Sequence, residues 1–179
     1  MNYAKLYHLA YHDELTNTFN RRAIIDVGEK YFSLSKRTKQ IMTVMMIDLD
    51  KMKVINDTYG HLAGDQAVIS LSAIVQNNLR EEDALGRYGG DEFIAVLPNT
   101  RVDEAVKLVE RLIAKIEEDN TSKDHPYGSL SASFGLCQNS NEDKSIQDLL
   151  NKADIALYEA KKTDRSSYFS YLSDGHSSS

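Results

Sequence analysis

Residues 41–50 read IMTVMMIDLD, and this stretch decides the expected fold. The run over 41–47 is dense in apolar side chains, and it is short enough to be a strand that is buried on both faces. Asp48 and Asp50 follow it directly. Two carboxylates at the end of such a strand are well placed to meet Mg²⁺, which prefers oxygen ligands. Taken alone, the same pair is more often a solvated strand end.

The spacing of apolar residues predicts the elements on either side of this strand. Helices are expected over 3–11, 21–36, 62–79, 100–118 and 145–162, and strands over 85–88, 93–97 and 129–136. Thr100 and Asp103 resemble a capping pair at the start of the fourth helix. The order helix, strand, helix, hairpin, helix, strand, helix favours an α+β sandwich. We therefore expect one central, mostly antiparallel sheet with a ferredoxin-like split βαβ core, covered by helices.

Length, charge and cysteine content limit the class of protein. The 179 residues suit one domain with a full hydrophobic core. A net charge of −6 lacks the basic balance of proteins that wrap DNA or RNA, so no nucleic-acid partner is expected. The apolar run is far shorter than the roughly 20 residues that cross a bilayer, so no membrane insertion is expected. Cys137 stands alone and forms no internal disulfide, which favours a cytoplasmic protein.

A second acidic group lies in a glycine turn, because residues 87–93 read RYGGDEF. Glycine lets a backbone approach a ligand closely or take positive φ angles. The same residues are also explained by a common Gly-Gly hairpin, whose acidic side chains keep it hydrated. If the hairpin lies beside the strand that ends at Asp48, the acidic groups converge in an arrangement similar to two-metal phosphoryl transfer.

The run Gly89-Gly90-Asp91-Glu92-Phe93 spells the signature of GGDEF domains, and the chain resembles that family over roughly residues 11–165. The matching segments are Asp13-Glu14-Leu15-Thr16, Asn20-Arg21-Arg22, Asp48-Leu49-Asp50, Lys53, Ile55-Asn56-Asp57, Gly60-His61, Gly64-Asp65, Ala153-Asp154, Ala156-Leu157-Tyr158 and Ala160-Lys161. The resemblance implies a nucleotidyl-cyclase-like core. It also implies a diguanylate cyclase, which joins two GTP molecules into cyclic di-GMP and releases pyrophosphate.

For the metal and the chemistry, the resemblance implies a site for Mg²⁺, with Mn²⁺ as an alternative. Its ligands are expected to be Asp48, the main-chain carbonyl of Leu49, and Asp91, with Glu92 supporting a second ion. Asp91 also matches the family's proton acceptor, and a role as a ligand only stays open. Lys53 matches a position that stabilises phosphate charge, although a lysine after a turn is otherwise simply solvated. Asp91, Glu92 and Lys53 are thus the expected catalytic residues.

For the substrate, Asn56 and Asp65 match the family's guanine contacts. A carboxylate can accept hydrogen bonds from guanine N1–H and N2–H₂, a pair that adenine lacks. Relatives that make mixed adenine–guanine products replace this aspartate, so Asp65 favours GTP. The structural alternative is an acid in the first turn of a helix, favoured by the dipole. His61 matches a substrate contact or is a polar filler, and Gly89 and Gly90 complete the expected contacts.

Lys161 and Arg165 match the family's phosphate-holding pair, and a cationic helix C-terminus is the structural alternative. The family usually has Gly-Arg-Asn after the lysine. Here Asp164 precedes Arg165 and Ser166 follows it, so the chain departs from the pattern where Arg165 must be placed.

Arg80 and Asp83 stand shortly before Gly89 and resemble the family's product-binding RxxD motif. Arginine can bond guanine N7 and O6, and aspartate can take the Watson–Crick donors. Feedback inhibition by cyclic di-GMP is therefore implied, while a charged helix end and turn is the structural alternative.

The implied mechanism needs a two-fold homodimer, at least transiently, because each site holds one of the two GTP molecules. The competing reading is a weak or inactive GGDEF domain that binds GTP or cyclic di-GMP as a sensor. The expected organisation is an N-terminal helix over 1–12, which resembles the stub of a signalling helix, a catalytic domain over 13–170 and a disordered tail over 171–179. Such domains are commonly attached to a sensor domain, and none is visible in these residues.

Overall fold

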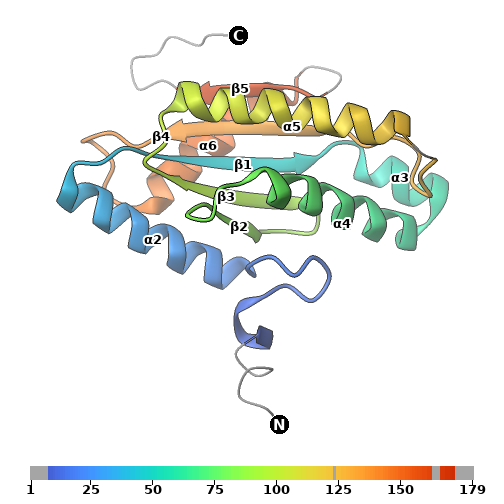
Figure 1. Cartoon of the computed structure of the whole chain (residues 1–179), viewed down its shortest axis with the longest axis horizontal. Helices are drawn as coiled ribbons and strands as arrows, with labels where there is room; N and C mark the ends of the chain where they lie inside the picture. The colour runs from blue at the N-terminus through green and yellow to red at the C-terminus, as the bar shows by residue number, and fades with distance from the viewer. Residues whose placement is uncertain (1–7, 123, 163–165, 172–179) are drawn as a thin grey trace.

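The computed structural model describes residues 8–122, 124–162 and 166–171, and Figure 1 shows a sheet with helices on both of its faces. Residues 8–11 are helical. The elements that follow are α2 (Arg21–Thr38), β1 (Met42–Leu49), α3 (Met52–Tyr59), α4 (His61–Asn78), β2 (Ala84–Arg87), β3 (Glu92–Pro98), α5 (Val102–Ser122), β4 (Ala132–Gln138), α6 (Ile146–Ala160) and β5 (Tyr168–Tyr171).

The strand order is β2-β3-β1-β4-β5, and every neighbouring pair is antiparallel except β4 and β5, which are parallel. The chain leaves β1, passes through α3 and α4, and returns as β2 with β3 between the two strands. It then leaves β3 through α5 and returns as β4 with β1 between them. These are two interleaved split βαβ units, so the predicted ferredoxin-like core and the mostly antiparallel sheet are confirmed.

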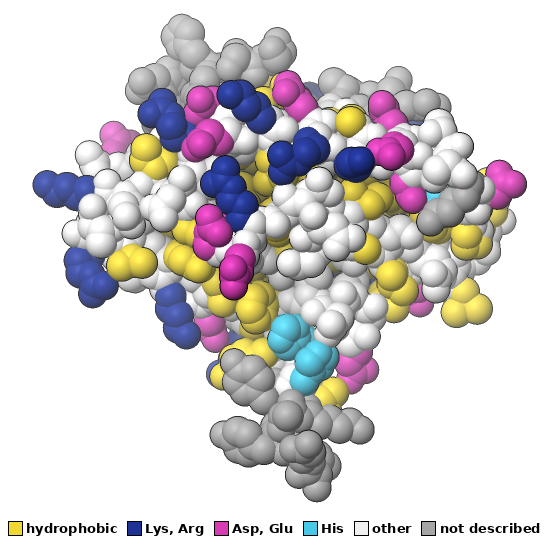
Figure 2. Space-filling model, viewed as in Figure 1, with side chains coloured by type: hydrophobic (Ala, Val, Ile, Leu, Met, Phe, Trp, Pro, Cys, Tyr) yellow, Lys and Arg dark blue, Asp and Glu magenta, His cyan; other side chains and the backbone are white. Residues whose placement is uncertain are grey.

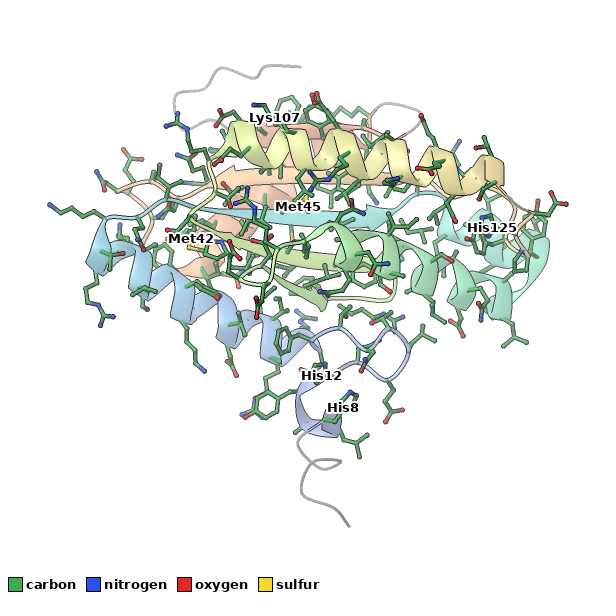
Figure 3. The ribbon with its side chains drawn as sticks, viewed as in Figure 1. His8, His12, Met42, Met45, Lys107 and His125 are labelled. Atoms are coloured by element: carbon green, nitrogen blue, oxygen red, sulfur yellow. The ribbon has the colours of Figure 1, made fainter. Side chains whose placement is uncertain are left out.

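Strand β1 is the centre of the molecule, and all eight of its residues are buried. Met45, Ile47 and Leu49 pack into a cluster with α4 and α5, whereas Met42, Val44 and Met46 pack into a second cluster with α2 and α6. Met42 and Met45, labelled in Figure 3, therefore serve opposite faces of the sheet. The alternation of the side chains along a strand explains why one apolar run fills both layers.

Helix α6 lies directly on β4 because β4 has a glycine at the contact. A Cβ atom at Gly135 would lie 2.1 Å from the Ala153 carbonyl oxygen and 2.4 Å from the Leu157 nitrogen. The start of α6 is fixed by a capping box between Ser145 and Asp148. The position of α6 is therefore set by the cap at its start and by the contact of Ala153 and Leu157 with β4.

Three features differ from the sequence-based expectation. Helix α3 and strand β5 were not predicted. The Thr100–Asp103 capping pair is wrong, because the Thr100 hydroxyl donates to the Pro98 carbonyl at 2.9 Å. At the start of α5, the Arg101 N–H instead donates to Glu104 Oε2, and the Val102 N–H donates to Gln138 Oε1. Gln138 belongs to β4, and such a partner from another element leaves no local sequence signal.

The expected N-terminal helix over 3–11 and the expected tail over 171–179 lie largely outside the described residues. Within the described part of the chain, no helix has the length and apolar character to cross a bilayer.

Candidate active site

The acidic end of β1 lies beside the glycine turn, a neighbourhood that the sequence left open. Asp48 is directly opposite Glu92 in the antiparallel β1–β3 pair. The Leu49 N–H donates to the Asp91 carbonyl at 3.0 Å, which extends the pairing beyond the strand. The sheet itself thus places three carboxylates, those of Asp48, Asp91 and Glu92, at one edge.

Asp48 is the buried member of this group, with 6% of its surface exposed, and the Lys161 ammonium lies 2.6 Å from its Oδ1. Burial, together with the charges of Asp91 and Glu92, raises the pKa of Asp48 to about 6, although the Lys161 ammonium opposes the shift. Asp91 and Glu92 are therefore close enough to Asp48 to repel its charge. A cation bound between them would relieve this repulsion.

The donor chemistry of this edge fits a hard divalent ion that shares its ligands with a nucleotide. Among the residues that the structure describes, no three His, Cys, Asp or Glu side chains are grouped so as to hold a metal by themselves. Mg²⁺ does not require such a cage, because it commonly takes one or two carboxylates and completes its shell with phosphate oxygens and water. Asp48 and Asp91 are suitable oxygen donors for that mode.

The glycine turn is held by one arginine. The Arg87 guanidinium donates to the Gly90 carbonyl at 3.2 and 2.7 Å and to both Asp13 carboxylate oxygens at 3.2 Å. Positive φ angles occur at Gly60 and Gly128 but not at Gly89 or Gly90. Among the described residues, nothing lies within 4 Å of a Cβ atom built at Gly90, whereas one built at Gly89 would lie 2.6 Å from Glu92 Oε2. The structure therefore leaves room for a ligand to approach the backbone closely at Gly90, whereas at Gly89 the Glu92 side chain occupies the space that a Cβ atom would need.

Helices α3 and α4 carry four of the predicted residues and meet at Gly60, which has φ 89°. Lys53 and His61 are exposed on them, whereas Asn56 and Asp65 are half-buried. The first turn of α4 contains no acidic residue, so Asp65 lies beyond the reach of the simple dipole explanation.

Comparison with known protein families shows to which family the chain belongs. A family model described as diguanylate cyclase, GGDEF domain, matches residues 10–167. The chain belongs to this family. A diguanylate cyclase of Vibrio cholerae is 34% identical over 165 residues, which cover 90% of this chain and 50% of that protein. The chain spans about half or less of the length of the first curated relatives that it matches.

Solved GGDEF domains share the fold. The domain of DgcB from Caulobacter crescentus, solved with c-di-GMP, superposes with a TM-score of 0.85 over 92% of this chain and 94% of that one, at 24% identity. The domain of TpbB from Pseudomonas aeruginosa gives a TM-score of 0.82 at 29% identity, over 90% of this chain and 95% of that one. The α+β architecture of this GGDEF domain is therefore that of its family.

Lys161 ends α6 and reaches the acidic edge of the GGDEF domain. It is the C-cap residue of the helix, and 41% of its side chain is exposed. Its ion pair with Asp48 is a specific contact that the general preference for cations at a helix C-terminus does not require. Arg165, the second residue of the expected phosphate-holding pair, lies outside the described residues.

The RxxD residues form a tight turn beside a pocket. The Arg80 N–H donates to Asp83 Oδ2 at 2.8 Å, and the Asp83 N–H donates to the Arg80 carbonyl at 3.1 Å. The other carboxylate oxygen of Asp83 is buried and has no hydrogen-bond partner in the part of the chain that the structure describes, and burial raises the pKa of Asp83. A pocket of about 250 Å³ is lined by Arg80 and Asp83 together with Lys107 and Arg111 of α5.

Sequence reasoning missed the contribution of α5 to this pocket. Lys107 and Arg111 are one helical turn apart on α5, and the Arg111 guanidinium donates to the Asn78 carbonyl at 3.0 Å. Lys107 is labelled in Figure 3, and Figure 2 shows basic and acidic side chains gathered over α5 on this face. Their spacing was the available signal, but a charged stripe of this kind is also typical of an ordinary solvated helix face.

Sequence reasoning also missed the role of Asp13. Its carboxylate accepts hydrogen bonds from the Thr16 N–H and hydroxyl, and it pairs with Arg87. Burial alone would raise the pKa of Asp13, but these bonds and the Arg87 charge hold it below its usual value. The segment before α2 is thereby tied to the turn that carries Asp91 and Glu92.

Proposed function

We propose that this GGDEF domain is a diguanylate cyclase, which converts two GTP molecules into cyclic di-GMP and two pyrophosphates with Mg²⁺, or with Mn²⁺ in its place. One observation carries the proposal. The pairing of β1 with β3 puts the buried Asp48 beside Asp91 and Glu92, within reach of the Lys161 ammonium. Its membership of the family and its curated diguanylate cyclase relatives support the same reaction.

Asp48, Asp91, Glu92 and the Leu49 carbonyl would hold the ion, which when bound neutralises phosphate charge. Asp91, which is half-buried, accepts the proton of the GTP 3′-hydroxyl. The 3′-oxygen then forms a bond to the α-phosphorus of the second GTP, and the bond from that phosphorus to the bridging oxygen breaks, so that pyrophosphate leaves. Positioning and charge supply the rate enhancement, without a covalent enzyme intermediate.

The substrate contacts are divided between the helices and the turn. Asn56, His61 and Asp65 of the α3–α4 pair face guanine. Lys53, Lys161 and Arg165 hold the phosphates, and the turn at Gly89 and Gly90, whose backbone is open at Gly90, lets the nucleotide come close. A carboxylate at position 65 selects guanine over adenine, because adenine lacks the paired N1–H and N2–H₂ donors.

Two copies of the domain complete the reaction, since each carries one GTP and each 3′-oxygen attacks the partner's phosphate. The product binds at Arg80 and Asp83 and inhibits its own synthesis. Asp83 lines the same pocket as Lys107 and Arg111, and one of its carboxylate oxygens has no hydrogen-bond partner among the described residues, so the turn offers an acceptor group beside two cations, which supports this site. Since GTP is a cytoplasmic nucleotide, the proposed reaction takes place in the cytoplasm.

The test incubates the purified chain with GTP and Mg²⁺ at several protein concentrations and identifies the products by mass spectrometry. We expect cyclic di-GMP and pyrophosphate, with a rate that rises more than linearly with dilute protein. Asp91→Asn should abolish the product, while Glu118→Gln, on the exposed side of α5, should not. If GTP binds but no product forms at high protein concentration, the domain is a nucleotide-binding sensor and the cyclase proposal is wrong.

A further inference from the structure

A glycine in α4 bears directly on the proposed guanine contact. Gly64 is buried and faces α3. A Cβ atom at this position would lie 2.0 Å from Asn56 Oδ1, 3.1 Å from Asn56 Cγ and 2.9 Å from Met52 Cε. A carbon atom and an oxygen atom that are not bonded cannot approach to 2.0 Å. The Asn56 side chain therefore occupies the space that any other residue at position 64 would need.

Backbone conformation does not explain this glycine. Gly64 lies within a regular helix and is not among the glycines with positive φ, which in the described part of the chain are Gly60 and Gly128. Glycine is among the poorest helix formers, so its presence here needs another reason. Close approach of two helices is the reason that the geometry provides.

The orientation of the Asn56 amide depends on this contact. Asn56 Oδ1 is fully buried and has no hydrogen-bond partner among the described residues. An amide that is not fixed by hydrogen bonds is fixed by the shape of its surroundings. Here the bare Gly64 backbone is part of those surroundings, and it is rigid because it lies within a helix.

We propose that Gly64 is a positioning residue for guanine recognition. Its lack of a side chain lets α4 close onto α3, so that the Asn56 amide keeps the orientation in which it meets the base beside Asp65. The inference rests on the proposed function, in which Asn56 and Asp65 contact guanine. Gly64 itself touches no substrate and acts through Asn56.

The test is a double-mutant cycle of Gly64→Ala and Asn56→Ala, read by calorimetric binding of 3′-deoxy-GTP with Mg²⁺. This analogue lacks the attacking hydroxyl, so binding is measured without turnover. We expect Gly64→Ala to weaken binding roughly tenfold, as the loss of a base contact does. In the Asn56→Ala background the same change should have no further effect, because the group that it displaces is gone. Binding of 3′-deoxy-ATP should not weaken in any variant.

Gly28→Ala is the matched control. Gly28 is also a buried helical glycine, in α2, and its Cβ atom would lie 2.9 Å from the Ile146 side chain. It can disturb packing but lies in the other core layer, so the affinity for 3′-deoxy-GTP should stay unchanged. Thermal unfolding of each variant separates lost stability from lost affinity.

Each remaining outcome has a definite meaning. If Asn56→Ala binds 3′-deoxy-GTP normally, the guanine contact and the role of Gly64 are both wrong. If Asn56→Ala weakens binding but Gly64→Ala does not, or if their effects add, the contact stands and the inference for Gly64 is overturned. If Gly64→Ala fails to fold, recovery in the double variant supports coupling through Asn56. A double variant that also fails to fold shows that Gly64 acts through other contacts, and the inference is then wrong.

Discussion

The Lys161 ammonium lies 2.6 Å from Oδ1 of Asp48 and joins the end of α6 to the end of the central strand. The two partners differ in exposure, since 8% of the Asp48 side chain and 41% of the Lys161 side chain are accessible. The carboxylate is fixed, whereas the lysine has room to move. We therefore expect Lys161 to exchange this carboxylate for nucleotide phosphate during the reaction.

Replacing Lys161 tests that exchange. Lys161→Met should lower kcat/KM for GTP by about 10–100-fold, because a charge-assisted contact to phosphate is lost. Steady-state pyrophosphate release measures the effect. Lys162→Met is the control, since Lys162 pairs with Glu159 on the surface of the same helix end. Equal losses in the two variants would show that the charge of the helix end matters and that the Asp48 contact does not.

Asp48→Asn should make the domain more stable and inactive. Burial raises the pKa of Asp48 to about 6, above the unfolded value of 3.8, so the ionised carboxylate weakens the fold at pH 7. The amide removes that cost and also loses the Lys161 ion pair, which leaves a net gain of about 1–2 kcal/mol. Urea unfolding at pH 7 measures it. A lower stability, or retained cyclase activity, would contradict the role proposed for Asp48 as a buried metal ligand.

Much of the fold was readable from residues 41–50, because an apolar run of that length can only be satisfied between two layers of helices. Helix α3 was missed because it has only eight residues, half of them polar, and Ile55 is the only one whose side chain is fully buried. Strand β5 has four residues and only one of them is buried. Its parallel partner β4 precedes it by a whole helix, so no turn signal marks the pair.

The residues of the site could be predicted from the sequence only where a motif matched a known family. Asp48 and Glu92 are neighbours because of the order of the strands in the sheet, and the sequence only suggested that order. The Lys161–Asp48 pair and the position of Arg111 beside Arg80 depend on how α6 and α5 lie on the sheet. Contacts between residues so distant in the chain leave no spacing pattern in one sequence.

The stability of the fold should depend on pH through the ion pair of Asp143, in the segment between β4 and α6, with Lys152 of α6. Burial would raise the pKa of Asp143, but bonds from Lys152 and Ser140 hold it below 3.8, while Asp143 raises the pKa of Lys152 above 10.5. The carboxylate therefore stabilises the fold above pH 3.8 and loses this effect as the pH falls through its lowered pKa. The lysine stabilises it below pH 10.5 and loses its effect above.

Asp143→Asn should accordingly lower the free energy of unfolding at pH 7 by about 2–4 kcal/mol, since 1% of the Asp143 side chain is exposed. The difference from the unsubstituted chain should shrink as the pH is lowered below 3.8. Denaturant unfolding at both pH values measures it. Glu142→Gln, at an exposed neighbouring position, is the control, and an equal loss there would refute the role of the buried pair.

Product inhibition should need α5 as well as the RxxD turn. Arg80→Ala and Arg111→Ala should each raise the inhibition constant for cyclic di-GMP by about tenfold or more, because each removes a cation from the same pocket. Initial rates at increasing product concentration measure it. Arg101→Ala, which removes an exposed arginine paired with Asp103, should change nothing. Unchanged inhibition in Arg80→Ala would show that cyclic di-GMP does not inhibit the domain through this site.

The bare backbone at Gly135 has a consequence for how this domain can change over time. Because α6 presses its main chain onto β4 there, any side chain at position 135 would push the helix outward and carry Lys161 away from Asp48. A residue with no chemistry of its own thus sets the distance between two charged groups at the far end of a helix. Libraries that randomise only polar residues around the acidic edge would never sample the position that holds the edge together.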